Sequence, residues 1–292
     1  MRLSNLLMAI ASIFFSILNI NAEKIFFKAY NCHDKLIFEK QVPFQNEHST
    51  LNFKFNRLYE NGDYFVIEGP QYMNIQLDSN IRASNIYTPN GKFKFIIPNN
   101  ENGINYPEKS FTGVEHKISI KTSTEKEKSM YRNVALNSFD IRGNSNFYPH
   151  ATSNSECRSE SFYAARNAID GNKTNIMHGK WPYQSWGPDK GVSLWFKIDF
   201  GRMVEIDKLV IVNRAQYIDL HDSYWNQAIV EYSDGKMETI KIEKTDLPQE
   251  IKIKKHKTTW VKFSSLKAQE QKWCSWIEVE AWGIDLGSKN KL

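Results

Sequence analysis

The chain has 292 residues, with 38 Lys and Arg against 33 Asp and Glu, so its formal net charge is only +5. This mild charge argues against a nucleic-acid binder, which would show a clustered basic excess. Hydrophobic residues make up 41% of the chain and aromatic residues 13%, which is enough to build a core and excludes global disorder.

The N-terminus carries the pattern of an export signal. Arg2 precedes an uncharged apolar run at residues 6–18, and the small residue Ala22 ends the segment. This order is typical of a secretory signal peptide, and the run is shorter than the roughly 20 residues of a membrane span. We expect cleavage after residue 22, leaving a net charge of +4 because one Arg and no acid are removed. The mature protein would be secreted or held at the cell surface; an uncleaved anchor is the alternative.

Residues 23–130 predict a first β domain. Seven short segments between Lys24 and Thr122 alternate apolar and polar residues in steps of two, as strands with one buried face do. Turn residues such as Pro89-Asn90-Gly91 separate them. Without a convincing amphipathic helix, the pattern predicts an antiparallel sandwich or barrel. The one short helix expected here follows Thr124, which can cap its first turn.

A second β domain is predicted for residues 131–284, followed by a polar tail at 285–292. Residues 164–170 predict one turn of helix, and strand-like segments follow from about residue 192 to residue 283. Ser233-Asp234-Gly235 predicts a hairpin between two of these segments. The fold class expected for the chain is therefore all-β, with two β-sandwich domains.

Aromatic and polar residues gather in a loop at residues 178–187, HGKWPYQSWG. Aromatic rings in a loop indicate a binding surface, because a sugar ring packs its apolar face on them and its hydroxyls need hydrogen-bonding partners. The candidate ligand-binding residues in this loop are His178, Trp181, Tyr183 and Trp186. The alternative is that the two Trp rings fold back and cap the barrel.

A second polar and aromatic segment, residues 213–225, follows a predicted strand. Its guanidinium and carboxylate groups suit vicinal hydroxyls or a ligand carboxylate. The alternative is an internal salt bridge between Arg214 and Asp222 that fixes the loop, and both roles are compatible. The candidate ligand-binding residues here are Arg214, His221, Asp222, Tyr224 and Trp225.

The three cysteines leave two interpretations open. Export permits a disulfide, and Cys157 with Cys274 is the pair we expect if there is one, because each lies near one end of the second domain. Three buried free thiols, Cys32 included, are equally compatible with a chain of this size.

Several motifs, taken in order, resemble a known family. AARNAIDGNKTN at 164–175, LWFKIDFGRMVEIDKLVI at 194–211, AIVEYSDG at 228–235 and WIEVEAWG at 276–283 are similar to the discoidin or coagulation-factor C-type domain and to family 32 carbohydrate-binding modules. The aromatic loop with RAQYIDLHDSYW resembles a bacterial, secreted carbohydrate-binding branch. The resemblance covers about residues 131–284 and implies a galactose-binding-like jelly roll with ligand-binding loops at one end.

The resemblance also implies a structural calcium ion. The family's metal ligands correspond here to Asp170, Asn172, Thr174 or Asn175, and Glu278. Oxygen-only ligands suit calcium rather than zinc. On the residues alone, Asp170-Gly171-Asn172 is equally compatible with an ordinary β-turn.

The sequence contains no nucleophile elbow, HExxH pair, glycine-rich phosphate loop or CxxC pair. We therefore expect a secreted, lectin-like protein that is not an enzyme and that binds a glycan or polysaccharide, with no nucleic-acid partner. The alternatives are an adhesion module for protein or an anionic phospholipid surface, and an accessory part of a polysaccharide-processing enzyme.

Overall fold

The protein is described by a computed structural model that covers residues 24–43, 50–98, 103–143, 145–190, 193–214, 222–268, 270 and 272–287. The predicted export signal, His221 and most of the predicted tail lie outside the described residues. Within the described ranges, no helix is long and apolar enough to cross a membrane.

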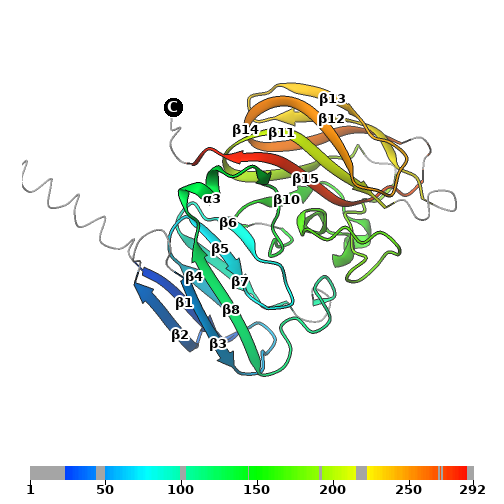
Figure 1. The fold of residues 1–292 in the computed structure, drawn as a ribbon. Helices are drawn as coiled ribbons and strands as arrows, with labels where there is room; N and C mark the ends of the chain where they lie inside the picture. Colours follow the sequence, from blue (N-terminus) through cyan, green and yellow to red (C-terminus); the bar gives the residue numbers. More distant parts are fainter. Residues whose placement is uncertain are drawn as a thin grey trace, which may run out of the picture.

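Two four-stranded antiparallel sheets form the N-terminal domain (Figure 1). Their strand orders are β2-β1-β4-β7 and β3-β8-β5-β6. The seven predicted strands are present, and the structure adds β6, which is too short to show a clear alternation in the sequence. The bounds are β1 (Lys24–Tyr30), β2 (Leu36–Pro43), β3 (Thr50–Asn56), β4 (Tyr64–Glu68), β5 (Tyr72–Gln76), β6 (Ser84–Tyr87), β7 (Lys92–Ile96) and β8 (Glu115–Thr122).

Alternation along the strands builds the core of this domain. In β7, Phe93 and Phe95 are buried while Lys92 and Lys94 are exposed. In β1, the ring of Phe27 packs between the two sheets. Its centroid lies 4.6 Å from that of the partly buried Phe53 in one sheet and 4.9 Å from that of the buried Phe65 in the other. Much of the aromatic content of the chain therefore serves to fill a sandwich.

The predicted short helix is α3 (Glu125–Ser129), and its N-terminus carries the expected cap. Glu127 N donates to Thr124 Oγ1, and Thr124 N donates to a carboxylate oxygen of Glu127. This reciprocal pair satisfies two backbone groups that a short helix would otherwise leave unpaired. The helix ends just before the first strand of the C-terminal domain.

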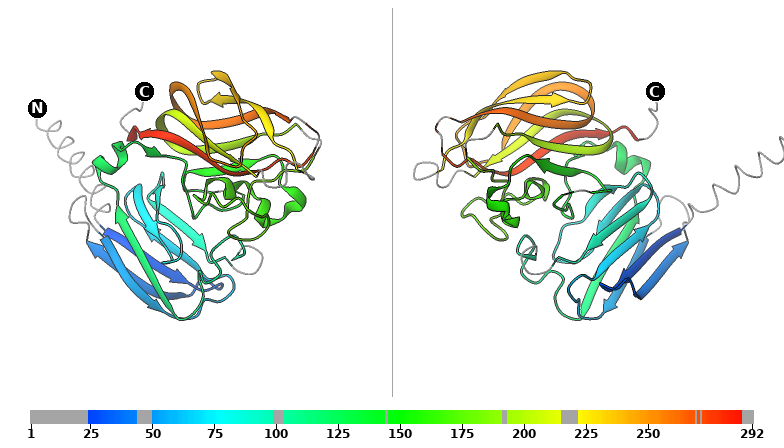
Figure 2. Two further views of the ribbon diagram at one scale, coloured as in Figure 1. Left: turned by 45° about the vertical axis from the view of Figure 1, so that its right-hand side comes forward. Right: turned by 180° about the vertical axis from the view of Figure 1, so that it is seen from behind.

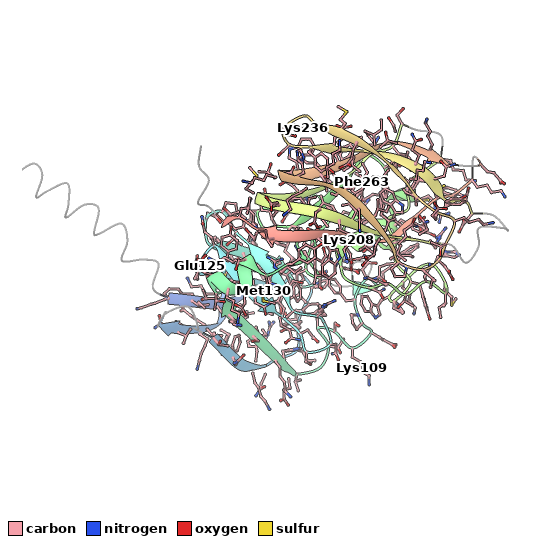
Figure 3. The ribbon with its side chains drawn as sticks, turned by 45° about the horizontal axis from the view of Figure 1, so that its top comes forward. Lys109, Glu125, Met130, Lys208, Lys236 and Phe263 are labelled. Atoms are coloured by element: carbon pink, nitrogen blue, oxygen red, sulfur yellow. The ribbon has the colours of Figure 1, made fainter. Side chains whose placement is uncertain are left out.

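The C-terminal domain is a second sandwich with the strand order β13-β12-β14-β11-β15-β9, and β10 also pairs with β11. Figure 3 shows Phe263 inside it and Lys236 at its outer edge. The bounds are β9 (Arg132–Asn133), β10 (His150–Ser153), β11 (Phe196–Asn213), β12 (Trp225–Tyr232), β13 (Met237–Lys241), β14 (Gln249–Ala268) and β15 (Trp276–Asp285), with 3-10 helices η2 (Cys157–Ser159), η3 (Ser161–Tyr163) and η4 (Ala165–Ile169). The all-β, two-sandwich fold class is thus confirmed.

Two long strands each join segments that the sequence predicts as separate. Within β11, residues 196–199 pair with residues 260–263 of β14, and residues 204–211 pair with residues 249–258. The register shifts between these two stretches, where Gly201 adopts a φ of +65°. A side chain at Gly201 would overlap the ring of Tyr148, with a Cβ only 2.3 Å from Tyr148 Cδ2. The glycine therefore allows the long strand to bend.

The two domains lie side by side (Figure 2), and side chains pack across their junction. Phe139 and Phe147 follow the predicted boundary at residue 131, yet both are fully buried in the hydrophobic core of the N-terminal sandwich. The Phe147 ring lies 4.4 Å from that of Phe93. Tyr87 and Tyr148 exchange two backbone hydrogen bonds of 2.9 Å. The junction is therefore a shared core as well as a chain connection.

The structure shows no disulfide among the described residues, which include all three cysteines. Cys157 and Cys274 are buried free thiols, and Cys32 is exposed. The expected pairing of Cys157 with Cys274 is therefore wrong, and the alternative of three buried thiols holds for two of them.

His150 lies in the junction with both ring nitrogens beside hydrogen-bond acceptors. Nδ1 is 2.7 Å from Asp140 Oδ1, and Nε2 is 2.6 Å from the Gly143 carbonyl oxygen. Burial opposes the charged ring, but Asp140 and the Gly143 carbonyl together raise the pKa of His150 above its ordinary value. The folded protein therefore binds more protons than the unfolded chain between the two pKa values, and its stability decreases as pH rises through that window.

This predicts a pH-dependent stability that His150→Gln removes. The free energy of unfolding, from urea titrations between about pH 5.5 and about pH 8.5, should fall for the wild type as pH rises above the unfolded value of about 6.5. The variant should lose this component, whereas His33→Gln, at an exposed histidine, should keep it. Equal slopes for wild type and His150→Gln would contradict the prediction.

Candidate ligand-binding end of the C-terminal domain

Three segments meet at one end of the C-terminal sandwich, which we call the loop end. They are Arg214 after β11, residues 222–223 before β12, and residues 273–275 before β15. Arg214 N donates to Ser275 O at 3.0 Å, and Ser223 N donates to Trp273 O at 2.7 Å. These backbone bonds hold the three segments together although they are distant in the sequence.

The predicted salt bridge braces this end. Arg214 Nη2 donates to Asp222 Oδ2 at 2.7 Å, and the two residues are only 5% and 1% exposed. Arg214 Nε and Nη1 are also buried, and neither has a hydrogen-bond partner in the part of the chain that the structure describes. Leaving such donors unpaired costs free energy. Arg214 therefore fixes the loop and keeps two buried N–H groups that have no partner among the described residues.

Trp273 supplies an aromatic ring at the loop end that the sequence did not single out. The ring is half-buried, and Lys190 Nζ lies 4.6 Å from its centroid. Trp273 also forms a parallel bridge with Asp222. The available signal was a Trp three residues before the last strand, at the same end as Arg214.

His178 is separated from Ser275 of the loop end by two residues, Tyr163 and Gly187, that contact each other. The exposed His178 has its Nδ1 3.3 Å from the hydroxyl of Tyr163. Tyr163 in turn packs against Gly187, where an added Cβ would lie 2.9 Å from Tyr163 Cδ1 and 3.0 Å from Ser275 Oγ. Gly187 thus permits the close approach that links the His178 side to the Arg214 side.

The prediction that Trp186 and Trp225 contact a ligand is wrong. They are 0% and 3% exposed, and their rings stack 5.2 Å apart in the core with Trp276. For Trp186, the alternative of a ring that folds back into the barrel is the one observed. A buried indole cannot present its face to a sugar, so these two residues support the loop end from within.

Of the remaining candidates, one lies at the domain junction, two are half-buried and one lies outside the described residues. Trp181 lies at the junction with the N-terminal domain, where its backbone N donates to Ile104 O at 2.7 Å. Tyr183 and Tyr224 are half-buried, and their contact with a ligand stays a prediction. His221 lies outside the described residues.

Two predicted metal ligands, Asp170 and Glu278, are buried carboxylates on adjoining segments. They are 5% and 0% exposed. Asp170 accepts hydrogen bonds from Asn172 N at 2.9 Å and Gln184 Nε2 at 2.7 Å. Glu278 Oε2 accepts one from Gly171 N at 3.2 Å, whereas the buried Glu278 Oε1 has no partner among the residues described. Burial raises the pKa of Asp170 to about 6 and that of Glu278 well above its usual range, to which the nearby Asp170 charge adds.

These carboxylates fit a hard cation, because oxygen donors and uncompensated negative charge are what calcium requires. The other two predicted ligands, Asn172 and Thr174, belong to the same turn as Asp170 but are hydrogen-bonded to each other. Asn172 Oδ1 accepts from Thr174 N at 3.1 Å and Thr174 Oγ1 at 2.8 Å. Within the described ranges, no group of three or more His, Cys, Asp or Glu side chains forms a metal cluster. Of the four predicted ligands, Asp170 and Glu278 are the two buried carboxylates.

Residues 150–279 match the family model of the F5/8 type C domain, the discoidin family. These residues are an F5/8 type C domain. The match covers the loop end, η4 and both buried carboxylates, and it leaves the N-terminal sandwich unassigned. It also agrees with the resemblance that the motifs of this segment show. No curated protein matches the chain.

Several solved structures are similar to part of the chain. A fucose-binding module from Streptococcus pneumoniae is 22% identical, with 51% of this chain and 96% of that chain covered and a TM-score of 0.37. Chitosan-binding module 1 from the chitosanase/glucanase of Paenibacillus sp. IK-5 is 16% identical, with 52% and 99% covered and a TM-score of 0.37. The family 32 module of C. perfringens NanJ, in complex with galactose, is 15% identical, with 45% and 91% covered and a TM-score of 0.36.

Proposed function

We propose that this is a secreted, non-catalytic protein whose F5/8 type C domain binds a saccharide at the loop end. The observation that carries the proposal is Arg214, with two buried N–H donors that lack a partner among the described residues, on the same end as the half-buried ring of Trp273. A saccharide supplies what these groups need. Its hydroxyl oxygens accept hydrogen bonds, and its apolar ring face packs on an indole.

The charge at this end favours a neutral ligand over an anionic phospholipid. Asp222 lies in contact with the guanidinium of Arg214, so the donors are offered with little net positive charge. A phosphate group would instead be attracted by several unpaired cations. Lys190, whose ammonium group lies 4.6 Å from the centroid of the Trp273 ring, adds a donor for the hydroxyls at the rim of this end.

We further propose that Asp170 and Glu278 hold a structural calcium ion. The ion would supply positive charge to two carboxylates that burial otherwise destabilises. The turn at residues 170–175 directly precedes the aromatic loop. Fixing this turn would hold the position of His178 relative to the rest of the domain.

Arg214→Lys tests the saccharide site. The substitution keeps a cation beside Asp222 but removes the forked donors of the guanidinium. We expect affinity for the saccharide identified on a glycan array to fall at least tenfold, since a hydrogen bond from a charged donor contributes roughly 1.5–3 kcal/mol. Calorimetric titration with that saccharide gives the change in Kd, and circular dichroism shows that the variant is folded.

Trp273→Ala is the second variant, because it removes a half-buried ring without touching the salt bridge. It should also weaken binding, whereas Trp260→Ala, at a half-buried Trp in the middle of β14, should leave the Kd unchanged. Binding should hardly change with salt concentration. Full affinity in both Arg214→Lys and Trp273→Ala, or a steep loss of binding with salt, would refute a neutral-saccharide site at the loop end.

A further inference from the structure

A separate cavity of about 420 Å³ lies between the two domains. Its volume is within the range of about 300–1,000 Å³ that small-ligand sites occupy. The N-terminal domain contributes Tyr59, Tyr106 and Phe111, and the C-terminal domain contributes Lys180 and Trp181. In Figure 3, Lys109 marks the N-terminal side, since the residues before and after it line the cavity. None of the lining residues belongs to the loop end.

Hydrogen bonds from both domains hold the walls of this cavity in place. Trp181 N donates to Ile104 O at 2.7 Å, which ties the aromatic loop to the segment that carries Tyr106. Asn105 Nδ2 donates to Ser161 O at 2.8 Å across the same junction. The Arg166 guanidinium lies 4.9 Å from the centroid of the Tyr106 ring. The cavity is therefore a defined part of the domain junction.

Two hydroxyl groups of the cavity walls lack hydrogen-bond partners. Tyr59 Oη and Ser110 Oγ are both buried, and neither is paired within the described ranges. The Tyr59 ring is fixed by stacking on His116 at a centroid distance of 3.9 Å. Burial raises the pKa of Tyr59 above its ordinary value, so its hydroxyl keeps the proton that it can donate. A buried hydroxyl without a partner destabilises the structure unless a ligand supplies one.

The charged residues of the cavity favour a ligand that donates hydrogen bonds. Glu60 and Glu108 contribute two carboxylates, against one ammonium group from Lys180. Glu60 Oε1 is also 3.1 Å from Arg57 Nη2, which fixes its position at the rim. Carboxylates accept hydrogen bonds and repel anions. The lining therefore disfavours phosphates and carboxylates and suits a neutral polyhydroxylated molecule.

We propose that this cavity is a second saccharide-binding site, which takes a neutral sugar residue with its ring face on Trp181 and its hydroxyls on Tyr59, Ser110 and the carboxylates. The site does not depend on the proposed function of the loop end, because the two share no residue. Binding here bridges the two domains and stabilises their junction. With two sites in one chain, a saccharide with several binding units is held far more tightly than a single unit.

Fluorine NMR of 5-fluorotryptophan-labelled protein tests both sites in one titration. The chain has 8 Trp, and Trp181→Phe and Trp273→Phe assign the two resonances of interest. The probes are galactose, fucose, glucose, N-acetylglucosamine and lactose, each to about 100 mM, well above a millimolar Kd. We expect at least one sugar to shift the Trp181 resonance in a saturable manner, in the wild type and in Arg214→Lys alike.

Hydroxyl deletions then test the chemistry of the cavity. Tyr59→Phe and Ser110→Ala should each weaken the Trp181 response by roughly threefold to tenfold, as the loss of one neutral hydrogen bond predicts. Tyr131→Phe, whose hydroxyl bonds to Asp207 outside the cavity, should have no effect. The variants are folded if their remaining Trp resonances stay at wild-type positions.

The two Trp resonances show separately whether the cavity and the loop end bind a sugar. A Trp181 response without a Trp273 response supports the cavity and refutes the loop end. A Trp273 response alone does the reverse. If no sugar shifts either resonance, both proposals are wrong. A Trp181 shift that Tyr59→Phe and Ser110→Ala both leave unchanged would overturn the cavity proposal, because the binding would not use its unpaired hydroxyls.

Discussion

Trp186→Ala should lower the free energy of unfolding by about 3–5 kcal/mol, because it removes a large ring from the centre of the C-terminal core. The ring is 0% exposed, and its centroid lies 4.9 Å from that of Phe196 and 5.2 Å from that of Trp225. Its Nε1 also donates to Ser155 O at 3.0 Å. The loss is large against a typical total stability of about 5–15 kcal/mol. Urea unfolding followed by circular dichroism measures it.

Trp181→Ala is the matched control for this substitution, because Trp181 lies five residues away in the same loop and is only half-buried. It should destabilise the protein much less than Trp186→Ala. The pair separates the two roles that the sequence allowed for these rings. If Trp186→Ala keeps wild-type stability and loses saccharide binding, then Trp186 is a ligand-contacting residue and the core role is refuted.

Calcium should raise the thermal unfolding midpoint of the C-terminal domain by about 5–10 °C when its concentration is about 100 times the Kd. The reason is that the ion compensates the buried charges of Asp170 and Glu278, which are 5% and 0% exposed. Glu278→Gln should abolish this shift. In the presence of a chelator, the variant should be more stable than the wild type, since the amide avoids the free-energy cost of burying a carboxyl group whose pKa burial has raised. Differential scanning calorimetry with calcium and with EDTA measures both effects.

Glu280→Gln is the control for the calcium experiment. Glu280 is two residues further along β15 and 6% exposed, but it pairs with Lys173 Nζ at 2.7 Å. Its substitution should leave the calcium shift in place. An unfolding midpoint of the wild type that is the same in calcium and in EDTA would show that the two carboxylates do not hold the ion.

Local patterns predicted most of the strands. The alternation of KFKFI places Phe93 and Phe95 inside because successive side chains on a strand point to opposite faces. The cap at Thr124 and the hairpin at residues 233–235 were equally local, and the structure contains both. The sequence did not show that β11 is one continuous strand, because the shift in register at Gly201 interrupts the period of two without ending the strand.

The sequence predicted the main polar group of the candidate site but not its aromatic ring. The expected pair of Arg214 and Asp222 is present at the loop end. Trp273 was missed and Trp225 was wrongly chosen, although both lie at or near the start of a strand. Trp225 is the first residue of β12, and its ring is buried in the core. Trp273 lies three residues before β15, and its ring stays half-buried. The direction of each ring depends on which segments lie across from it.

By itself, the sequence determined the all-β class, the strand pattern and the F5/8 type C motifs, because periodicity and turn chemistry act over a few residues. Only the tertiary structure decided which loop tryptophans are buried, that Phe139 and Phe147 belong to the neighbouring core, and that Trp181 lines a cavity with Tyr59. Exposure of a loop side chain is a property of contacts between segments far apart in the chain. No local pattern encodes those contacts, so 13% aromatic content could indicate a core, a binding surface or both until the fold separated them.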